Sequence, residues 1–300
     1  MARPRVVNFL EYIPLRISVF LIDCLSVNVA LSLGRFCGTA AWYVLHKRRK
    51  TAISNVLYSG ITSDAREARR IAKESFKSFS ILAVESLLAS KLITPDTVDQ
   101  YVDFDAPKET FELIENPMLG GIFVSAHIGN WEVSGHIISF KKRLAAVARN
   151  LDNPFVQRFM EKRNPRRNIF IVEKHSKDRM ALIRPLKTGM MLGLIADQHA
   201  ASHGVMVDFF GHPASTVTSP ARLHLATGCP IIYGYFIRTG KLKFKAICSE
   251  PIIYEKTDDK ASDIIRITQD INKRLEKVVK DYPEQYLWSH RRWRNMETVK

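Results

Sequence analysis

The sequence predicts an α/β fold with a mostly parallel central sheet flanked by helices, preceded by an N-terminal helical extension that associates with a membrane. Three observations support this prediction. Residues 1 to about 95 carry apolar side chains at helical spacing. From Tyr101 onward, short apolar runs alternate with amphipathic segments, as in layers of parallel strands and helices. Of the 300 residues, 46% are hydrophobic, which is enough to bury a sizeable core.

The alternation places the elements along the chain. We expect strands at residues 121–125, 144–148, 169–172, 190–196, 205–210, 231–237 and 242–247. We expect helices from about residue 130, from 154, through 183, from 219 and over 261–279. Ligands of such sheets gather beyond the carboxyl ends of the strands, so the loops after Ser125, Ala148 and Ala196 are the candidate site. No glycine-rich phosphate-binding motif follows any strand, which argues against a nucleotide-binding protein.

The N-terminal segment is apolar but is not a clean membrane span. Residues 15–33 are interrupted by Arg16 and Asp23, whereas a span needs ~20 apolar residues with few charges. Residues 34–45 are again apolar, and they are followed by the basic run His46-Lys47-Arg48-Arg49-Lys50, a pattern typical of a bilayer interface with anionic headgroups. The alternative is a buried helical hairpin that packs on the soluble domain.

We therefore divide the chain into an N-terminal helical membrane anchor, residues 1–50, and an α/β domain, residues 51–300. Because basic residues beside apolar segments stay on the cytoplasmic side, we expect the anchor on the cytoplasmic face of a membrane. The first helix of the second part is expected over residues 65–89, with Ser63 or Asp64 as its N-cap.

The formal charge of +15 predicts an anionic partner, either a phospholipid surface, a phosphorylated substrate, an acidic protein or nucleic acid. Basic runs at residues 141–143 and 162–167 are the case for nucleic acid. No RNA-binding or helix-turn-helix signature accompanies them, and no stacking aromatics are interleaved, so we expect no nucleic-acid partner. The four cysteines are far apart and form no C-x-x-C pair, which disfavours a zinc knuckle or a disulfide framework.

The most informative stretch is Ser125-Ala126-His127-Ile128-Gly129-Asn130-Trp131-Glu132, which follows a buried strand. A histidine can take a proton from a hydroxyl near neutral pH, so His127 is the candidate general base. A carboxylate on its other ring nitrogen would fix the tautomer and stabilise the imidazolium, and we assign this role to Glu132. Gly129 allows a tight turn, and free N–H groups at Gly129 and Asn130 would face the substrate oxyanion.

This block resembles the H-x-x-x-x-E motif of the lipid A biosynthesis acyltransferases, the lauroyl and myristoyl transferases of Gram-negative envelopes. Glycerolipid members of the wider lysophospholipid-acyltransferase-like superfamily carry H-x-x-x-x-D instead. Three later blocks are similar to that family in order and spacing, at residues 149–154, 197–216 and 288–293. The sequence departs from the pattern at residues 149–151, where an aromatic-arginine-proline run is expected, and at His199.

The resemblance implies an acyl carrier protein thioester as donor, a hydroxyl of a lipid A precursor as acceptor, and the bacterial inner membrane as location, with no cofactor or metal. No G-x-S-x-G elbow is present, so we expect direct attack by the acceptor hydroxyl rather than an acyl-serine intermediate. Arg149 suits either the oxyanion or a phosphate of the acceptor. We expect Asn153, Asp197 and Gln198 to contact the substrate, and the basic run at 162–167 to help dock the acidic carrier.

Three alternatives remain at this point. Asp197, His199 and His203 could hold the metal of a hydrolase, although Gly204 breaks any helix that would align the two histidines. An interaction protein on an inactive transferase fold is disfavoured by the intact His127 and Glu132. Another glycolipid, such as a phosphatidylinositol mannoside, could replace the lipid A precursor as acceptor.

Overall fold

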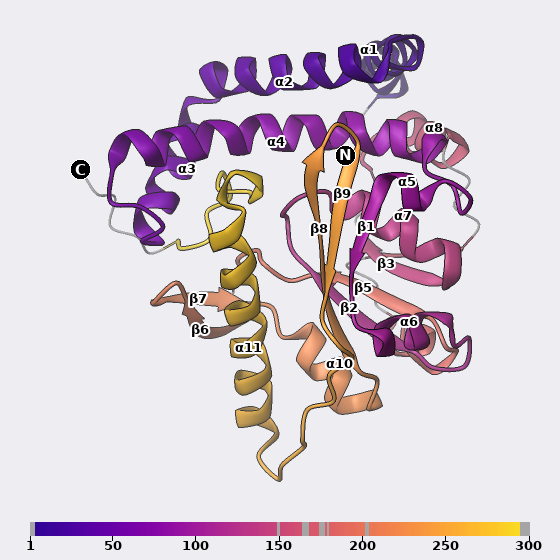
Figure 1. The fold of residues 1–300 in the computed structure, drawn as a ribbon, viewed down its shortest axis with the longest axis vertical. Coiled ribbons are helices and arrows are strands. Elements are labelled where there is room, and N and C mark those ends of the chain that lie inside the picture. Colours follow the sequence, from indigo (N-terminus) through magenta and orange to yellow (C-terminus); the bar gives the residue numbers. More distant parts are fainter. Residues whose placement is uncertain are drawn as a thin grey trace.

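The computed structural model describes residues 4–148, 151–163, 168–173, 178, 180–201 and 204–294 (Figure 1). The helices are α1 (Arg5–Cys24), α2 (Val27–Val44), α3 (His46–Tyr58), α4 (Ala65–Leu92), α5 (Val98–Tyr101), α6 (Lys108–Glu115), α7 (Trp131–Lys141), α8 (Pro154–Arg163), α9 (Ile183–Lys187), α10 (Ser219–Thr227), α11 (Lys260–Asp281) and the 3-10 helix η2 (Pro283–Gln285). The strands are β1 (Val102–Asp105), β2 (Gly121–Ser125), β3 (Leu144–Ala148), β4 (Ile169–Glu173), β5 (Met191–Ile195), β6 (Val205–Phe209), β7 (His212–Thr216), β8 (Ile231–Gly240) and β9 (Lys243–Cys248).

Seven strands form one sheet in the order β1-β9-β8-β2-β5-β3-β4. Every neighbouring pair is parallel except β8 and β9, which are antiparallel. The predicted mostly parallel sheet flanked by helices is therefore confirmed. The segment predicted at 205–210 does form a strand, β6, but it pairs with β7 in a separate antiparallel ribbon. Strand β1 was not predicted from the sequence.

The centre of the sheet is β2, which is buried along its whole length. Its side chains alternate between two packed layers. Ile122 and Val124 face the layer that contains α3, α10 and α11, whereas Phe123 faces the layer that contains α6 and α7. A strand covered on both faces has to be apolar at every position, and the sequence of β2, Gly-Ile-Phe-Val-Ser, meets this requirement at all but its last residue.

The long helix α4 lies across one end of the molecule, with α2 along it (Figure 1). Asp64 is the N-cap of α4, as predicted, and its carboxylate accepts hydrogen bonds from the N–H groups of Arg66 (3.0 Å) and Glu67 (3.3 Å). Helix α2 approaches α4 closely at Gly38, where a Cβ atom would lie 2.5 Å from the Cα atom of Lys77. Only glycine permits this approach.

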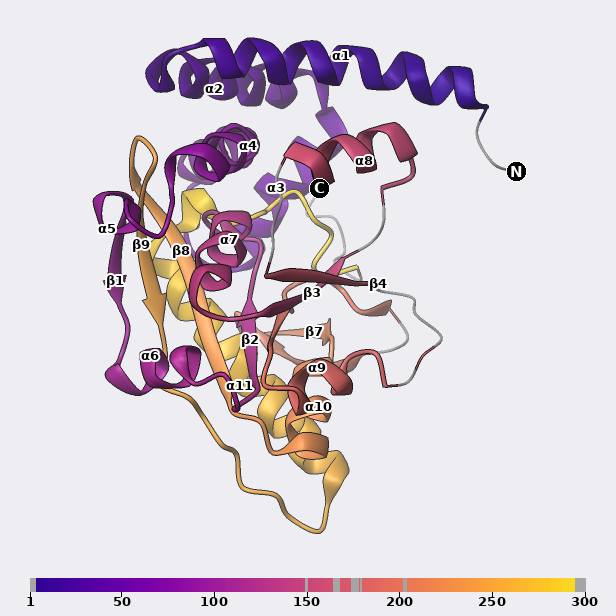
Figure 2. The same ribbon diagram turned by 90° about the vertical axis from the view of Figure 1, so that its right-hand side faces the viewer.

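Figure 2 shows α1 as the outermost helix, beside α2 and above α8. The predicted domain boundary at residue 50 falls inside α3, so it does not coincide with the end of a helix. Among the described helices, none is both long enough and apolar enough to cross a bilayer.

Candidate active site

The site lies where two neighbouring parallel strands end. In the register of β2 and β5, Ser125 is paired with Ile195. Two residues beyond that pair, the Nδ1 atom of His127 lies 2.7 Å from the Oδ1 atom of Asp197. The structure thus brings together the loops after Ser125 and Ala196, as the sequence predicts. The third loop, after Ala148, continues into Arg149 and Asn150, which lie outside the described residues.

The His127–Asp197 pair is buried on the Asp197 side and partly open on the His127 side. The side chain of Asp197 is 3% exposed and that of His127 is 20% exposed. Burial alone would raise the pKa of Asp197, but the charge and hydrogen bonds of His127, together with the charge of Arg292, hold it below its usual range. An ionised carboxylate can only accept, so Nδ1 of His127 donates to Asp197 and the lone pair of Nε2 is an acceptor. The amide Nε2 of Gln198 lies 3.4 Å from that atom.

This arrangement corrects the assignment of Glu132. The sequence interpretation placed the Glu132 carboxylate on the second ring nitrogen of His127, but the structure places Asp197 there. Glu132 is instead the second residue of α7, where its charge favours the positive end of the helix dipole. Asp197 is therefore the carboxylate that is placed to orient His127. Its burial and its hydrogen bond to His127 leave it unsuited to the substrate contact that the sequence analysis predicted for it.

The turn between His127 and α7 is fixed by contacts with β8 and with the C-terminal segment. Gly129 has a φ of +59°, and a Cβ atom there would lie 1.9 Å from the carbonyl oxygen of Phe236. Its N–H group donates to the carbonyl of Gln285 (3.2 Å), and the N–H group of Asn130 donates to that of Phe236 (2.7 Å). Both N–H groups are therefore occupied, which corrects the prediction that they face a substrate oxyanion.

Asn130 has a structural role instead of the predicted substrate contact. Its side chain is fully buried and caps α7 by accepting from the N–H group of Val133 (3.1 Å). Its amide donates to Glu85 of α4 (3.0 Å), and Glu85 forms a bidentate ion pair with Arg238 of β8. The active-site turn is thus tied to both α4 and β8.

An aromatic side chain that the sequence analysis did not single out forms one wall of the site. The ring of Trp131 lies edge-on to that of His127, with 4.8 Å between centroids. Phe79 of α4 packs on the other side of Trp131, at 5.7 Å. The position of Trp131 inside the H-x-x-x-x-E block was the available signal.

Asn153 is also a helix cap rather than an exposed substrate contact. It is 8% exposed, and its Oδ1 atom accepts from the N–H groups of Phe155 (3.0 Å) and Val156 (3.3 Å) at the start of α8. Its amide donates to the carbonyl of Asn8 in α1 (2.7 Å). Asn153 therefore fastens α8 to α1.

The comparison with known families agrees with this geometry. Residues 8–295 match the family described as "Bacterial lipid A biosynthesis acyltransferase". The chain belongs to this acyltransferase family. The chain is also 24% identical over 181 residues to phosphatidylinositol mannoside acyltransferases from two strains of Mycobacterium tuberculosis (CDC 1551 / Oshkosh and ATCC 25618 / H37Rv). These alignments cover 58% of this chain and 55% of each relative, so the chain spans about half the length of the curated relatives it matches.

One solved structure is similar to the acyltransferase over most of its length. The crystal structure of a 1-acyl-sn-glycerophosphate acyltransferase from Thermotoga maritima superposes with a TM-score of 0.38 and 14% identity. The superposition covers 84% of this chain and 97% of that one.

The C-terminal block of the acyltransferase, residues 288–293, closes around the site. Arg292 is 2% exposed and donates to the carbonyl of Ser215 and to the hydroxyl of Thr216, both at 2.6 Å. The imidazole of His290 accepts from the N–H group of His199 (3.1 Å), and burial, the largest effect, lowers the pKa of His290 to about 4. The N–H group of Leu287 donates to the carbonyl of His127 (3.0 Å). The C-terminal segment is therefore hydrogen-bonded to the backbone of His127 and of His199.

The described residues include only two of the three side chains of the rival metal site, Asp197 and His199. Asp197 is bonded to His127, and burial lowers the pKa of His199. His203 lies outside the described residues. Within the described part of the chain, no group of three or more His, Cys, Asp or Glu side chains is placed to hold a metal ion.

Proposed function

We propose that this enzyme transfers a fatty acyl chain from an acyl carrier protein thioester to a hydroxyl of a lipid A precursor. The observation that carries the proposal is the His127–Asp197 pair, in which a buried carboxylate orients a partly exposed imidazole at the carboxyl ends of β2 and β5. Membership of the lipid A acyltransferase family supports the same chemistry and names the class of acceptor.

The proposed reaction uses His127 first as a base and then as an acid. Nε2 takes the proton of the acceptor hydroxyl while that oxygen attacks the carbonyl carbon of the thioester. The imidazolium is stabilised by Asp197, whose carboxylate stays ionised. When the C–S bond breaks, the proton passes from Nε2 to the leaving thiolate, so the products are an ester and a free thiol. Arg149 remains the proposed partner of the oxyanion or of an acceptor phosphate.

A transfer assay tests this function directly. Purified enzyme is incubated with acylated carrier protein and a lipid A precursor, and the lipid is analysed by mass spectrometry for the mass of one added acyl chain. We expect the product with the wild-type enzyme and none with His127→Ala. If the wild-type enzyme released free fatty acid from the thioester at the same rate with and without acceptor, it would be a thioesterase and the proposal would fail.

A second acceptor class is favoured by the curated relatives, which are phosphatidylinositol mannoside acyltransferases. In this alternative, His127 and Asp197 act in the same way on a mannoside hydroxyl. The two acceptors are compared in one assay at equal concentration, and the ratio of their kcat/KM values decides between them. A ratio above about 10 corresponds to about 1.4 kcal/mol of discrimination and identifies the preferred acceptor class.

We also propose that the enzyme works on the cytoplasmic face of the bacterial inner membrane, with residues up to about 50 on an anionic lipid surface. Large apolar side chains are exposed along α1 and α2, among them Val6 (69%), Leu10 (61%) and Phe36 (68%). Contiguous exposed apolar surface of this kind is typical of a helix that lies in the bilayer interface. The basic run at 46–50 follows directly at the start of α3.

The donor is proposed to dock through the basic run at residues 162–167. Of these residues, 164–167 lie outside the described part of the chain. Because exposed charges are screened by salt, raising the ionic strength should increase the KM for the acylated carrier and leave kcat nearly unchanged. Reversal of Arg166 and Arg167 to Glu should have the same effect at low salt. An acyl-coenzyme A donor that worked as well as the acylated carrier, with the reversal variant unaffected, would contradict carrier docking at this run.

A further inference from the structure

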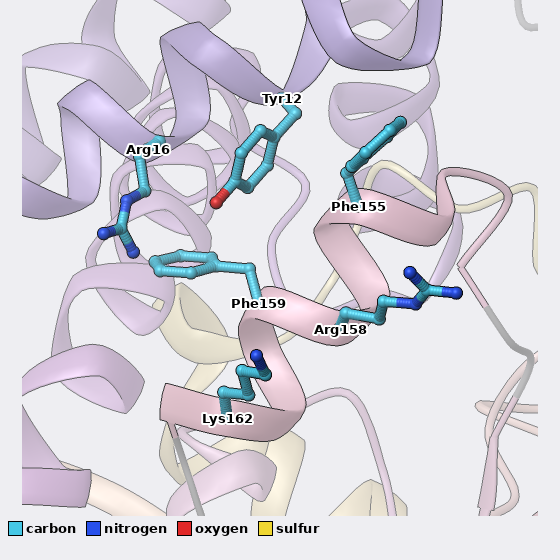
Figure 3. Close-up of a pocket in the computed structure, with 6 residues that line it drawn as sticks. All are labelled: Tyr12, Arg16, Phe155, Arg158, Phe159 and Lys162. Carbon is cyan, nitrogen blue, oxygen red and sulfur yellow. The ribbon is translucent and has the colours of Figure 1, made fainter. Parts of the chain in front are cut away.

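A pocket of about 510 Å³ lies between α1 and α8. Tyr12 and Arg16 come from α1, and Phe155, Arg158, Phe159 and Lys162 come from α8 (Figure 3). The sequence analysis assigned no pocket here, and the only one of these residues with a role in the proposed function is Lys162, the first residue of the run proposed to dock the donor. The pocket combines three aromatic rings with three cationic side chains.

The pocket is held together by packing rather than formed by loosely placed surface charges. The ring of Tyr12 lies 6.0 Å from that of Phe155 and 5.9 Å from that of Phe159, which is 9% exposed. The guanidinium of Arg16 sits over the Phe159 ring, 4.9 Å from its centroid. The hydrogen bond from Asn153 to α1 fixes the start of α8 relative to these residues. A stacked arginine keeps its planar donor face in a defined position.

The cationic side chains of the pocket have no acidic partner in the described part of the chain. Among the described residues, neither Arg16, Arg158 nor Lys162 forms an ion pair with a carboxylate, and no acidic residue lines the pocket. The nearby carboxylate of Glu11 lies 3.4 Å from the amide of Asn153 instead. In Figure 3, Arg16 lies above the Phe159 ring and Lys162 below it, whereas Arg158 points away to the right. Arginine forks and a lysine ammonium are the donors that proteins use to bind phosphate.

The exposed apolar face of α1 indicates which kind of molecule would bring a phosphate to the pocket. Its exposed apolar side chains recur at helical spacing, at Val6, Leu10, Ile13, Ile17 and Leu21, with exposed fractions of 37% to 69%. An amphipathic helix that buries such a face in a bilayer holds its flanking cations at the depth of the lipid phosphates. Because residues three apart are neighbours on a helix surface, Arg16 lies beside Ile13 at the border of this apolar face.

We infer that the pocket between α1 and α8 binds the phosphate of an anionic phospholipid headgroup at the membrane surface. The inference rests on the membrane attachment proposed above and adds a specific headgroup site to it. Helix α8 follows the loop after β3, and β3 ends at the same edge of the sheet as β2 and β5. A lipid bound in the pocket would therefore fix α8 beside the active-site edge while the acceptor lipid is held.

Vesicle flotation with matched surface charge tests the inference. One set of phosphatidylcholine vesicles contains phosphatidic acid, and the other is made equally negative with oleate, whose charge is a carboxylate. We expect the wild-type enzyme to bind the phosphatidic acid vesicles about 10-fold more tightly, the gain expected from one additional charge-assisted interaction. In Arg158→Gln/Lys162→Gln this preference should disappear. Its overall affinity should fall roughly 30-fold, because each cation near an anionic surface contributes ~1 kcal/mol.

The matched control removes two exposed lysines far from the pocket, in Lys256→Gln/Lys260→Gln, which has the same net charge. This control should keep the preference for phosphatidic acid. Thermal unfolding of each variant confirms that it is folded, and the side chains replaced are all exposed. A third variant, Arg16→Lys, keeps the charge but removes the planar fork over Phe159, and it should lose most of the preference.

Four results would overturn the inference. The first is equal binding of the wild-type enzyme to both vesicle types, and the second is an unchanged preference in the pocket variant. The third is complete competition by inorganic phosphate at concentrations that leave the vesicle charge unchanged. The fourth is a pocket variant that loses carrier protein binding but still binds vesicles as the wild type does. The third result would assign the pocket to free phosphate, and the fourth to the donor protein. Flotation requires no catalysis, so a protein without transferase activity that still showed the preference would refute the proposed function alone.

Discussion

The substitution Asp197→Asn tests which of two carboxylates, Asp197 or Glu132, orients the proposed catalytic histidine. In the wild-type protein, the carboxylate of Asp197 accepts a hydrogen bond from the Nδ1–H group of His127, and this leaves Nε2 as the proposed base. An asparagine amide can donate to Nδ1 instead. The imidazole would then carry its proton on Nε2, where it cannot accept one from the acceptor hydroxyl.

The expected magnitude follows from the geometry of the pair. The bond is 2.7 Å long and Asp197 is 3% exposed, so the pair makes a buried charge-assisted hydrogen bond. Such a bond contributes about 1.5–3 kcal/mol, and its loss in the transition state alone slows the reaction about 10- to 150-fold. In the Ser-His-Asp triad, the equivalent substitution lowers kcat about 10⁴-fold because the tautomer also changes. We therefore expect kcat to fall roughly 10³- to 10⁴-fold.

The assay measures kcat for acyl transfer at saturating donor and acceptor, with unfolding followed by circular dichroism. The matched control is Asp105→Asn, which removes an exposed carboxylate from the edge strand β1 and should leave kcat unchanged. Folded Asp197→Asn that kept more than a tenth of the wild-type kcat would refute the orienting role. A larger loss in Glu132→Gln than in Asp197→Asn would return that role to Glu132.

Three further predictions concern the base, the turn and the membrane. His127→Ala should abolish transfer and Glu132→Gln should leave a residual rate; an active, folded His127→Ala protein would show that another group is the base. Gly129→Ala places a Cβ atom 1.9 Å from a backbone carbonyl of β8, so urea denaturation should show a loss of more than ~3 kcal/mol, and an unchanged midpoint would contradict the geometry. Full-length protein should pellet with membranes at low salt and a form lacking residues 1–50 should not; pelleting of the truncated form would locate the anchor elsewhere.

A fourth prediction in the same series concerns pH. Burial lowers the pKa of His290 from 6.5 to about 4, so between these values the unfolded chain binds more protons than the folded one. The contribution of neutral His290 to the free energy of unfolding is therefore fully present above pH 6.5 and is lost as the pH falls toward 4. The full shift corresponds to about 3 kcal/mol, and partial exposure of the ring reduces this to roughly 2 kcal/mol. His290→Gln should flatten this part of the stability curve, and an identical slope in both proteins would contradict the assignment.

The location of the site could be predicted from the sequence, because it depends on local pattern. A buried strand that ends at Ser125 and is followed by Ala126 and His127 places His127 at the carboxyl edge of the sheet. The same argument identified the loop that contains Asp197. The pairing of these two residues could not be predicted. It depends on β5 being inserted between β2 and β3 in the sheet, and strand order is not legible from alternation along the chain.

The two asparagines assigned to substrate show a different limit. Asn130 and Asn153 each precede the first residue of a helix, which is the sequence signature of an N-cap. That signal was present in the sequence, but the resemblance to a catalytic family favoured a chemical role. Strand β1 was missed for another reason. Its sequence Val-Asp-Phe-Asp has only one fully buried side chain, so it lacks the apolar run used to identify the other strands.

The burial of Asp197 explains why the C-terminal block belongs to the site without lining it. A carboxylate removed from water is costly to ionise unless a positive charge compensates it. The charge and hydrogen bonds of His127 make the larger contribution to lowering the pKa of Asp197, and the charge of Arg292 adds a smaller one. Arg292 can do so because Ser215 and Thr216 of β7 hold its guanidinium, which lies over the ring of Phe209. The ribbon of β6 and β7 thus anchors a fixed positive charge that adds to the effect of His127 in lowering the pKa of Asp197. An ionised Asp197 in turn holds the proton of His127 on Nδ1, which leaves Nε2 as the proposed base.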